Sequence, residues 1–588
     1  MVWNHTSVFS APLVLSSPFR LYNELTHEYT KPGYNFSMRH YITFAAILPI
    51  AVLIVLTSIS PAYPDFVDDR LAAFKKNYTD DINAKKDAVK KLAPIDDPRL
   101  IEAIVIAYSD EPSRDTVDID TVYRLADEAL ETVRSELVAA EMHKQLSHKH
   151  WRVRARLTRM LGVLAFPASR DVLLKLGKTE KDERVLVELS EALGRFKDAS
   201  VVEFLQKTAM RPANTDIGMR AIVSLSDTGL PEGMKAIEEI MNANSAHEMI
   251  RAEALYWFCK NSPQQIRSVV TAALNDKSPA MQVMACDIIA HKKLDGFDSK
   301  LTELLSAPQW QLRVAATEAC GELKVANASA KIIEAWKKAG NADRYGVAAH
   351  GALLKITGKS FGPRWEYWDN WHAANKDTPK APAEKEGEYI SYHGIQIRSN
   401  NICFVFDRSG SMRERVKNKS GYLGEGSMPL DETRMGHIKG ELISSIRKLT
   451  NESKFNLVAF DHRLAPWKKE QVPASDSNKA DAIRWVTGQE AKGWTNVFDS
   501  LMLGIGRLDD RKTGKMNWNN GPDTVVVLSD GWPSAGTYVD SGRFLWEVRR
   551  MNRLRRIVIH TVGIAEECDR LLEPLALENR GTFRKIAE

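Results

Sequence analysis

Residues 404–412 read FVFDRSGSM. Three apolar residues run directly into Asp407, and Ser409 and Ser411 follow at alternate positions with Gly410 between them. Because glycine permits a tight backbone turn, these three oxygen-bearing side chains can face the same way. An apolar strand that ends in such a cluster indicates a polar site at the edge of a buried sheet.

The sequence around this stretch alternates between short apolar runs and helical patterns. The apolar runs, rich in Val, Ile and Phe, lie at 401–407, 454–460, 523–530 and 555–564. The helical patterns lie at 434–450, 477–487, 497–508 and 541–554. Nearly continuous apolar strands belong to a sheet covered on both faces, and their alternation with helices predicts a doubly wound (Rossmann-like) parallel α/β domain over 399–588.

Two further segments bring oxygen atoms to the same sheet edge, where such folds bind their ligands. Asp530 ends the 523–530 run, and Thr495 stands in GWTNVFDSL just before a helix. With the opening stretch they make a set of two carboxylates and three hydroxyls. Hard cations such as Mg²⁺ prefer oxygen ligands. The sequence therefore predicts a divalent-metal site, for Mg²⁺ or alternatively Mn²⁺ or Ca²⁺, at Asp407, Ser409, Ser411, Thr495 and Asp530.

Each residue of this set also has an ordinary structural interpretation. Asp407 alone fits a turn at a strand end, and Asp530 followed by Gly531 is a common turn signal. Ser409, Ser411 and Thr495 alone fit helix caps. Their joint occurrence at one sheet edge favours the metal site over these separate roles.

The constellation resembles the metal-ion-dependent adhesion site of the von Willebrand factor A domain family, with DxSxS, GxTN and SDG in the family's order. The resemblance implies that Ser409, Ser411 and Thr495 bind the metal through their hydroxyls. It also implies that Asp407 and Asp530 act largely through water. The sixth coordination position would be left for a carboxylate of a protein partner.

Two features near the expected site have no assigned role. A long polar loop, residues 413–433, separates Ser411 from the helix near Met435 and would border the metal crevice. It could shape partner choice or cover the site, and the sequence leaves both open. Asp461 follows the second strand and could reach the rim of the site.

A helical pattern repeats along residues 148–375. Its copies start 31 to 34 residues apart, at Trp151, Glu183, Ile217, Glu248, Pro279, Trp310 and Asp343. Such a period predicts a solenoid whose units bury their apolar faces by stacking on their neighbours. The pattern resembles HEAT-like repeats of the short type found in bilin-lyase-like proteins. Residues 63–147 are also expected to be helical, with an early unit at 81–109 and one longer charged helix at 119–147.

The solenoid is expected to offer a concave surface to partners, although its apolar stripe itself is core. It ends in Trp365, Trp368 and Trp371, which recur every three places and form one side of a helix. A hydrophobic cap on the last repeat is favoured over a ligand-stacking role, because terminal repeats must close the core. Residues 376–398 are expected to be a linker to the α/β domain.

Residues 41–59 carry no charge and are long enough to cross a bilayer. Basic residues precede them and Asp65, Asp68 and Asp69 follow, which places the N-terminus inside. Residues 38–62 are therefore either a single-pass transmembrane anchor or a signal peptide that starts at Met38. Residues 1–37 are a short cytoplasmic tail or an artefact of start-codon choice. Both interpretations export the remainder, as a membrane protein with an extracytoplasmic C-terminal part or as a secreted or periplasmic protein.

Composition excludes several classes of function. The formal net charge of +5 is small for 588 residues, and no basic tract indicates nucleic-acid binding. The five cysteines form no CxxC pair, so a zinc site or redox motif is not expected. The preferred hypothesis is an exported or membrane-anchored binding or scaffold protein that is not an enzyme.

Three alternatives remain open at this point. A metal-dependent phosphohydrolase could use Asp407 as its nucleophile. However, Ser409 stands where haloacid-dehalogenase-like enzymes need a second aspartate. A chelatase-like assembly factor would need a separate ATPase, because the chain has no GxxxxGK[ST] loop. A bilin lyase is suggested by repeat resemblance alone.

Overall fold

The computed structural model describes residues 63–110, 119–210, 215–374, 389–416, 427–506, 509–510, 515–530, 533–564 and 568–586. Residues 70–588 belong to one structural unit and residues 1–69 to another. Among the helices of the described residues, none is long and apolar enough to cross a bilayer. The expected anchor or signal peptide at 41–59 and the tail at 1–37 lie outside the described residues, so both stay predictions.

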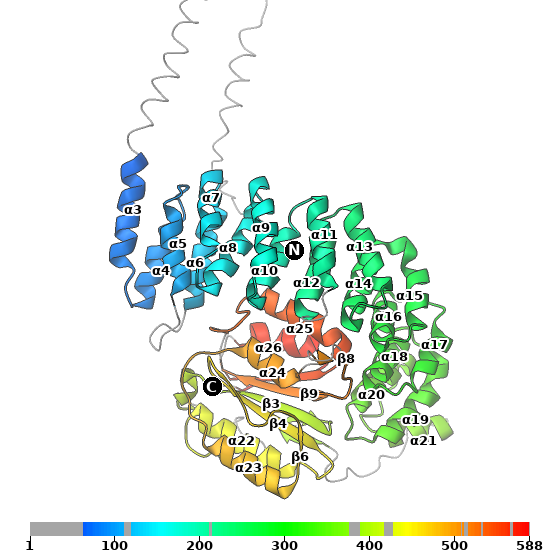
Figure 1. The fold of residues 1–588 in the computed structure, drawn as a ribbon. Helices are drawn as coiled ribbons and strands as arrows, with labels where there is room; N and C mark the ends of the chain where they lie inside the picture. The colour runs from blue at the N-terminus through cyan, green and yellow to red at the C-terminus, as the bar shows by residue number, and fades with distance from the viewer. Residues whose placement is uncertain are drawn as a thin grey trace, which may run out of the picture. The chain divides into compact units, whose positions relative to one another are not determined.

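Helices fill the described chain from residue 63 to residue 374 (Figure 1). They are α3 (Tyr63–Asn77), α4 (Ile82–Lys90), α5 (Leu100–Ser109), α6 (Ile119–Glu131), α7 (Glu136–Gln145), α8 (Trp151–Leu164), α9 (Pro167–Thr179), α10 (Glu183–Leu193), α11 (Ala199–Ala209), α12 (Thr215–Asp227), α13 (Pro231–Asn242), α14 (Glu248–Asn261), η1 (Pro263–Gln265), α15 (Ile266–Leu274), α16 (Pro279–Lys292), α17 (Asp298–Leu304), α18 (Trp310–Glu322), η2 (Ala326–Ala328), α19 (Ser329–Ala339), α20 (Tyr345–Thr357) and α21 (Trp365–Ala374). The predicted all-α solenoid is confirmed.

One helix of each repeat packs on the corresponding helix of the next. This inner row consists of α8, α10, α12, α14, α16, α18 and α20 (Figure 1). Glycine allows close contact within it, because a Cβ added at Gly162 would lie 2.5 Å from the Cα of Ala192. A Cβ at Gly321 would likewise lie 2.7 Å from the Cα of Ala352. The repeat therefore depends on small residues as well as on its apolar stripe.

The prediction of one longer helix over 119–147 is wrong. Two helices, α6 and α7, occupy this segment and are separated by residues 132–135. The Thr132 hydroxyl donates to the Ala129 carbonyl, and Ser135 caps α7 by accepting a hydrogen bond of 3.2 Å from the Leu137 amide. These local hydrogen bonds compete with the helical ones and divide the segment.

The three tryptophans of α21 close the last repeat. Trp368 is completely buried and makes edge-to-face contacts with Phe361, His350 and Trp371, with ring centroids 5.0, 6.1 and 6.1 Å away. Trp365 and Trp371 are half-buried. This packing supports a hydrophobic cap rather than a surface for stacking a ligand.

The C-terminal part is the predicted α/β domain. Its elements are β1 (Ile390–Tyr392), β2 (Ile395–Ile397), β3 (Asn401–Asp407), η3 (Gly410–Arg413), α22 (Arg434–Lys448), β4 (Lys454–Phe460), β5 (Leu464–Pro466), β6 (Val472–Pro473), α23 (Asp476–Thr487), α24 (Val497–Ile505), β7 (Asp509–Asp510), β8 (Lys515–Met516), β9 (Thr524–Ser529), α25 (Ser541–Arg555), β10 (Val558–Gly563), α26 (Asp569–Glu578) and β11 (Phe583–Lys585). The main sheet has the order β11-β10-β9-β3-β4-β5, and β5 and β6 pair with β4 antiparallel. The other pairs of this sheet are parallel, so the doubly wound fold is confirmed.

The expectation of a linker over 376–398 is wrong for its second half. Residues 390–397 form the β1–β2 hairpin, with His393 and Gly394 at its turn. Alternate residues of this hairpin face the domain core, and Tyr392 is buried with its ring 5.5 Å from that of Phe404. Residues 376–388 lie outside the described residues.

We expect Trp368→Ala to lower the free energy of unfolding of the solenoid by about 3–5 kcal/mol, because it removes a fully buried aromatic side chain. Urea unfolding followed by circular dichroism would measure this loss. Trp365→Ala, in the same helix at a half-buried position, should cost clearly less. Equal losses from the two substitutions would contradict the assigned cap.

Candidate metal centre

Adjacent parallel strands bring the two predicted carboxylates together. In the register of β3 and β9, Phe406 lies opposite Leu528, so Asp407, which ends β3, and Asp530, which follows β9, lie at the same sheet edge. Ser529, the last residue of β9, donates a hydrogen bond of 2.6 Å from its hydroxyl to Oδ2 of Asp407. The order of the strands thus brings Asp407 and Asp530 together, although they are 123 positions apart in the sequence.

The loop after β3 folds back over this edge. The backbone N–H of Ser409 donates to Oδ1 of Asp407 at 2.7 Å. The hydroxyls of Ser409 and Ser411 lie 3.1 Å apart, and that of Ser411 donates to Oδ1 of Asp530 at 2.9 Å. Four of the five predicted residues therefore form one continuous polar cluster.

The GWTN segment lies against the same loop. Gly410 donates its N–H to the Gly493 carbonyl at 2.9 Å, which places Thr495 two residues further along the segment. The Thr495 N–H donates to the Ser534 hydroxyl at 3.0 Å. Asn496 is the N-cap of α24, since its side chain accepts from the Asp499 amide. The alternative interpretation of Thr495 as this cap is therefore wrong.

The cluster is buried on most sides and reaches the surface at one. Asp407, Ser409, Asp530 and Thr495 are 0, 2, 3 and 7 % exposed. Ser411 is exposed. A ligand from outside could therefore approach the cluster from the side of Ser411.

Two buried carboxylates so close together are electrostatically unfavourable. Burial and then the nearby charge of Asp530 raise the pKa of Asp407 to about 7, although hydrogen bonds from Ser529 and Ser409 oppose the rise. Burial also raises the pKa of Asp530, which Arg434 partly offsets. The Arg434 guanidinium donates to Oδ2 of Asp530 at 3.1 Å. Among the described residues, Asp407 has no such basic neighbour in ion-pair contact, so the site has excess negative charge.

This donor set fits a hard divalent cation. Every side-chain donor is oxygen, and the excess negative charge of the carboxylates is what a cation would offset. Across the described residues, no group of three or more His, Cys, Asp or Glu side chains could hold a metal ion, so an ion at this cluster would depend on hydroxyl oxygens as well as on its two carboxylates. Ser409, Ser411 and Thr495 are the residues that would hold the ion, with Asp407 and Asp530 supplying charge beside it.

Sequence analysis missed Arg434 and gave Asp461 no role. Arg434 opens α22, and its guanidinium joins Asp530 to Glu414, whose carboxylate lies 2.9 Å away. Asp461 is fully buried and pairs with Arg408 at 3.2 Å. Its carbonyl accepts the Asn496 N–H at 3.2 Å, so Asp461 positions the GWTN segment. Only Asp461 had a detectable signal, its place at the end of a strand.

The described ends of the 413–433 loop approach each other. Val416 donates its N–H to the Glu432 carbonyl at 3.1 Å, and Arg415 forms a bridge with Thr433. Thr433 then caps α22 by accepting from the Gly436 amide. Residues 417–426 lie outside the described residues, so the predicted influence of this loop on partner choice stays a prediction.

Comparisons with known proteins identify the domain that contains these residues. The sequence profile of the von Willebrand factor type A domain matches residues 401–588. Residues 401–588 are a von Willebrand factor type A domain. HEAT repeats precede it, and their profile matches residues 139–226. Residues 401–588 are called the A domain below, and the solenoid remains the helical region described above.

Known relatives match about a third of this chain. Human inter-alpha-trypsin inhibitor heavy chain H4 is 27% identical over 201 residues, which are 34% of this chain and 20% of the relative. Human heavy chain H1 is 28% identical over 203 residues, with the same coverages. The chain thus spans about a fifth of the length of the curated relatives it matches.

A solved structure with a similar region is proximal thread matrix protein 1 from the mussel byssus, with a zinc-occupied MIDAS motif. It is 17% identical, covers 32% of this chain and 41% of its own, and has a TM-score of 0.22. This likeness is too weak to carry an argument about the metal.

We expect Asp407→Asn to raise the free energy of unfolding of the metal-free chain at pH 8 by about 1–2 kcal/mol, because it removes a buried charge. Below about pH 4 the Asp407 carboxyl is protonated in both the folded and the unfolded chain, so its raised pKa does not affect the free energy of unfolding. Between about pH 4 and pH 7 the unfolded chain loses this proton more readily, so the folded state is increasingly destabilised. The gain should therefore shrink between pH 8 and pH 5.

Urea unfolding in EDTA at the two pH values would test this expectation. Asp476→Asn, at an exposed position of α23, is the matched control and should change little. A loss of stability of Asp407→Asn at pH 8 would show that the buried negative charge of Asp407 does not destabilise the metal-free protein.

Proposed function

We propose that this chain is a non-catalytic binding protein whose A domain uses a divalent cation to capture an acidic group of a protein partner. The observation that carries the proposal is the cluster of two buried carboxylates with the hydroxyls of Ser409 and Ser411, which reaches the surface at Ser411 and has the segment of Thr495 beside it. Mg²⁺ is the preferred ion, with Mn²⁺ or Ca²⁺ as alternatives.

The cation would supply a Lewis-acid site with an open position for an external carboxylate. Ser409, Ser411 and Thr495 provide neutral oxygens, so the bound ion would keep part of its positive charge. Asp407 and Asp530 are hydrogen-bonded to Ser409 and Ser411, and their negative charge would lower the cost of holding that positive charge in a buried place. Such a site favours an anionic oxygen ligand, which is why we propose an acidic group on the partner.

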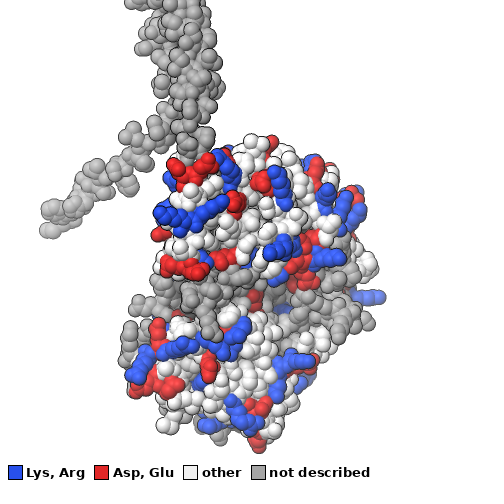
Figure 2. Space-filling view, turned by 60° about the vertical axis from the view of Figure 1, so that its left-hand side comes forward, with Lys and Arg blue, Asp and Glu red and all other residues white. Residues whose placement is uncertain are grey.

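The charge on the face shown in Figure 2 supports a protein partner rather than a nucleic acid. On the face shown in Figure 2, Lys and Arg side chains are interspersed with Asp and Glu side chains. No broad basic field is visible among the described residues of that face. The likeness of the A domain to inter-alpha-trypsin inhibitor heavy chains further supports a role in binding.

The geometry gives little support to a phosphohydrolase. A nucleophilic Asp407 would need an accessible oxygen, yet the residue is completely buried. Its Oδ1 accepts from the Ser409 amide and its Oδ2 from the Ser529 hydroxyl. We therefore propose that Asp407 has an electrostatic role.

We also propose that the A domain is exported. The uncharged run at 41–59, flanked by basic residues before and acidic residues after, supports an anchor or a signal peptide. The metal site would then work outside the cytoplasm, in a membrane-anchored or a released protein.

Isothermal titration of the full chain with Mg²⁺ and Mn²⁺ should show one site per chain. We expect Ser409→Ala to weaken binding about tenfold or more, because it removes a neutral ligand from a buried shell. Ser477→Ala, at an exposed position of α23, should leave the affinity unchanged. Unchanged affinity in Ser409→Ala would remove the proposed metal site.

Capture of partners from membrane extracts, with and without EDTA, then tests the second half of the proposal. Proteins retained on the wild-type chain should be lost in EDTA and on the Ser409→Ala chain. Metal-dependent phosphatase turnover by the wild type would favour the hydrolase instead.

A further inference from the structure

Helix α25 of the A domain lies beside the inner row of the solenoid (Figure 1) and packs on α16. Near the start of α25, Nη2 of Arg543 lies 2.8 Å from Glu191 and 3.4 Å from Glu188, both on α10. One helix further along the solenoid, Arg220 of α12 pairs with Glu547 and stacks on the ring of Trp546 at 4.9 Å. The inner row, expected to bind external partners, is thus occupied over these repeats by the chain's own A domain.

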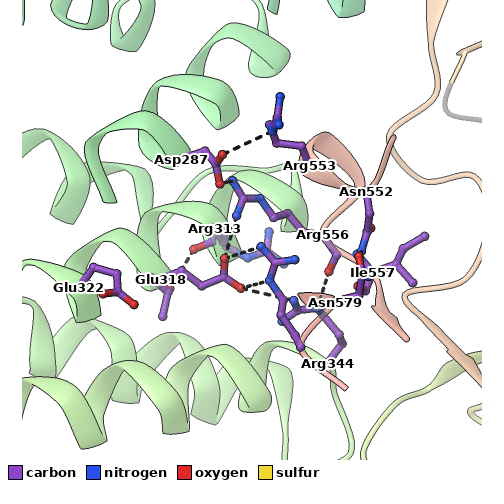
Figure 3. A network of polar contacts seen from close by, with 12 residues as sticks. Asp287, Arg313, Glu318, Glu322, Arg344, Asn552, Arg553, Arg556, Ile557 and Asn579 are labelled. Atoms are coloured by element: carbon purple, nitrogen blue, oxygen red, sulfur yellow. Dashed lines mark hydrogen bonds and ion pairs between the residues drawn. The ribbon is translucent and has the colours of Figure 1, made fainter. Parts of the chain in front are cut away.

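The far end of α25 contacts two more repeats (Figure 3). Arg556 pairs with Asp287 of α16 at 2.7 Å and with Glu318 of α18 at 2.8 Å. Arg580 reaches the same Glu318 at 2.6 Å, and Arg344 of the solenoid donates from Nε to the Arg556 carbonyl at 2.9 Å. Although burial raises it, these arginines lower the pKa of Glu318 to about 2.

The contact is built from buried charges. Glu547 and Arg556 are 1 and 2 % exposed. Removing one partner of a buried ion pair leaves an uncompensated charge, which is strongly unfavourable. The solenoid and the A domain are therefore held in one arrangement by ion pairs distributed along the whole length of α25.

A short segment joins this contact to the candidate metal centre. Residues 533–540 lead directly into the first turn of α25. Ser534 exchanges hydrogen bonds with the backbone of Thr495, at 3.0 and 2.9 Å. Gly536 lies so close to Asn496 that an added Cβ would be 2.1 Å from its Oδ1.

Aromatic contacts continue the same connection. Tyr538 packs edge-to-face on Phe498 of α24, with ring centroids 4.7 Å apart. The Arg543 guanidinium lies 4.8 Å from the centroid of the Tyr538 ring. Arg543 therefore contacts both the solenoid carboxylates and the segment that supports Thr495.

We propose that the solenoid has a further function as an internal clamp on the metal centre. By holding Arg543, the carboxylates of α10 fix residues 533–540, and this segment fixes Thr495 in the position that binds the cation. The inference rests on the proposed metal site. It adds that cation affinity in the A domain depends on residues of a different domain.

The clamp makes a prediction that separates it from a purely structural contact. A packing contact would affect only the stability of the chain, whereas a clamp also changes the affinity of a site built from other residues. An event that disturbs α10, such as binding of a protein to the solenoid, would then change the affinity of the metal site for the cation. It would thereby also change the affinity of the A domain for the acidic group that the cation binds.

The test replaces both solenoid carboxylates in the full chain, as Glu188→Gln with Glu191→Gln. We expect the Mn²⁺ affinity measured by isothermal titration to fall about fivefold or more. Arg543→Gln changes the same contact from the A domain and should give a similar loss. Two controls should leave the affinity unchanged. They are Glu203→Gln, on an exposed site of α11, and Arg549→Gln, on α25 but paired with Glu578 within the A domain.

Hydrogen exchange of the metal-free chain supplies a readout that does not need the ion. Amides of residues 494–499 and 533–540 should exchange faster in the double variant than in the wild type. Unchanged or increased Mn²⁺ affinity in a double variant that remains folded by circular dichroism would overturn the clamp and leave the metal site standing. If the wild type binds no Mn²⁺, the proposed function fails, and unchanged exchange would then overturn the clamp as well.

Discussion

Two aspartates lie at the ends of neighbouring strands, Asp407 as the last residue of β3 and Asp530 directly after β9, and their carboxylates are buried at the edge of the sheet. Hydrogen bonds from Ser529, Ser409 and Ser411 hold the pair in place but do not cancel its charge. Arg434 pairs with Asp530. This arrangement has a cost in free energy that an ordinary turn would avoid, and a cation bound next to the pair would offset it. The rest of the domain can be understood as the support for this site.

The solenoid contributes to that support in a way that its repeats alone do not indicate. Stacked helices usually leave their inner surface for partners. Here acidic residues on α10, α14, α16 and α18 receive the arginines of α25 and its neighbours. We therefore propose that external partners bind at the metal edge, whereas the inner row holds the A domain through these ion pairs.

Much of the fold could be predicted from the sequence because its signals are local. β3 and β4 have the expected bounds, 401–407 and 454–460, since their apolar runs are bounded by polar residues. The metal-site prediction depended on motif order, and the structure brings Asp407, Ser409, Ser411 and Asp530 into one cluster. The role of Arg434 and the contacts of α25 were missed, because they join residues far apart in sequence without a motif. The β1–β2 hairpin was missed because each strand has only three residues.

The central claim is that a divalent cation binds among Ser409, Ser411 and Thr495. Anomalous diffraction from a crystal of the full chain grown with Mn²⁺ tests it most directly. The account predicts one strong peak at about 2.0–2.4 Å from the hydroxyls of these three residues, with Asp407 and Asp530 beside it. A map at saturating Mn²⁺ without a peak there, and with Ser411 still bonded directly to Asp530, would contradict the account.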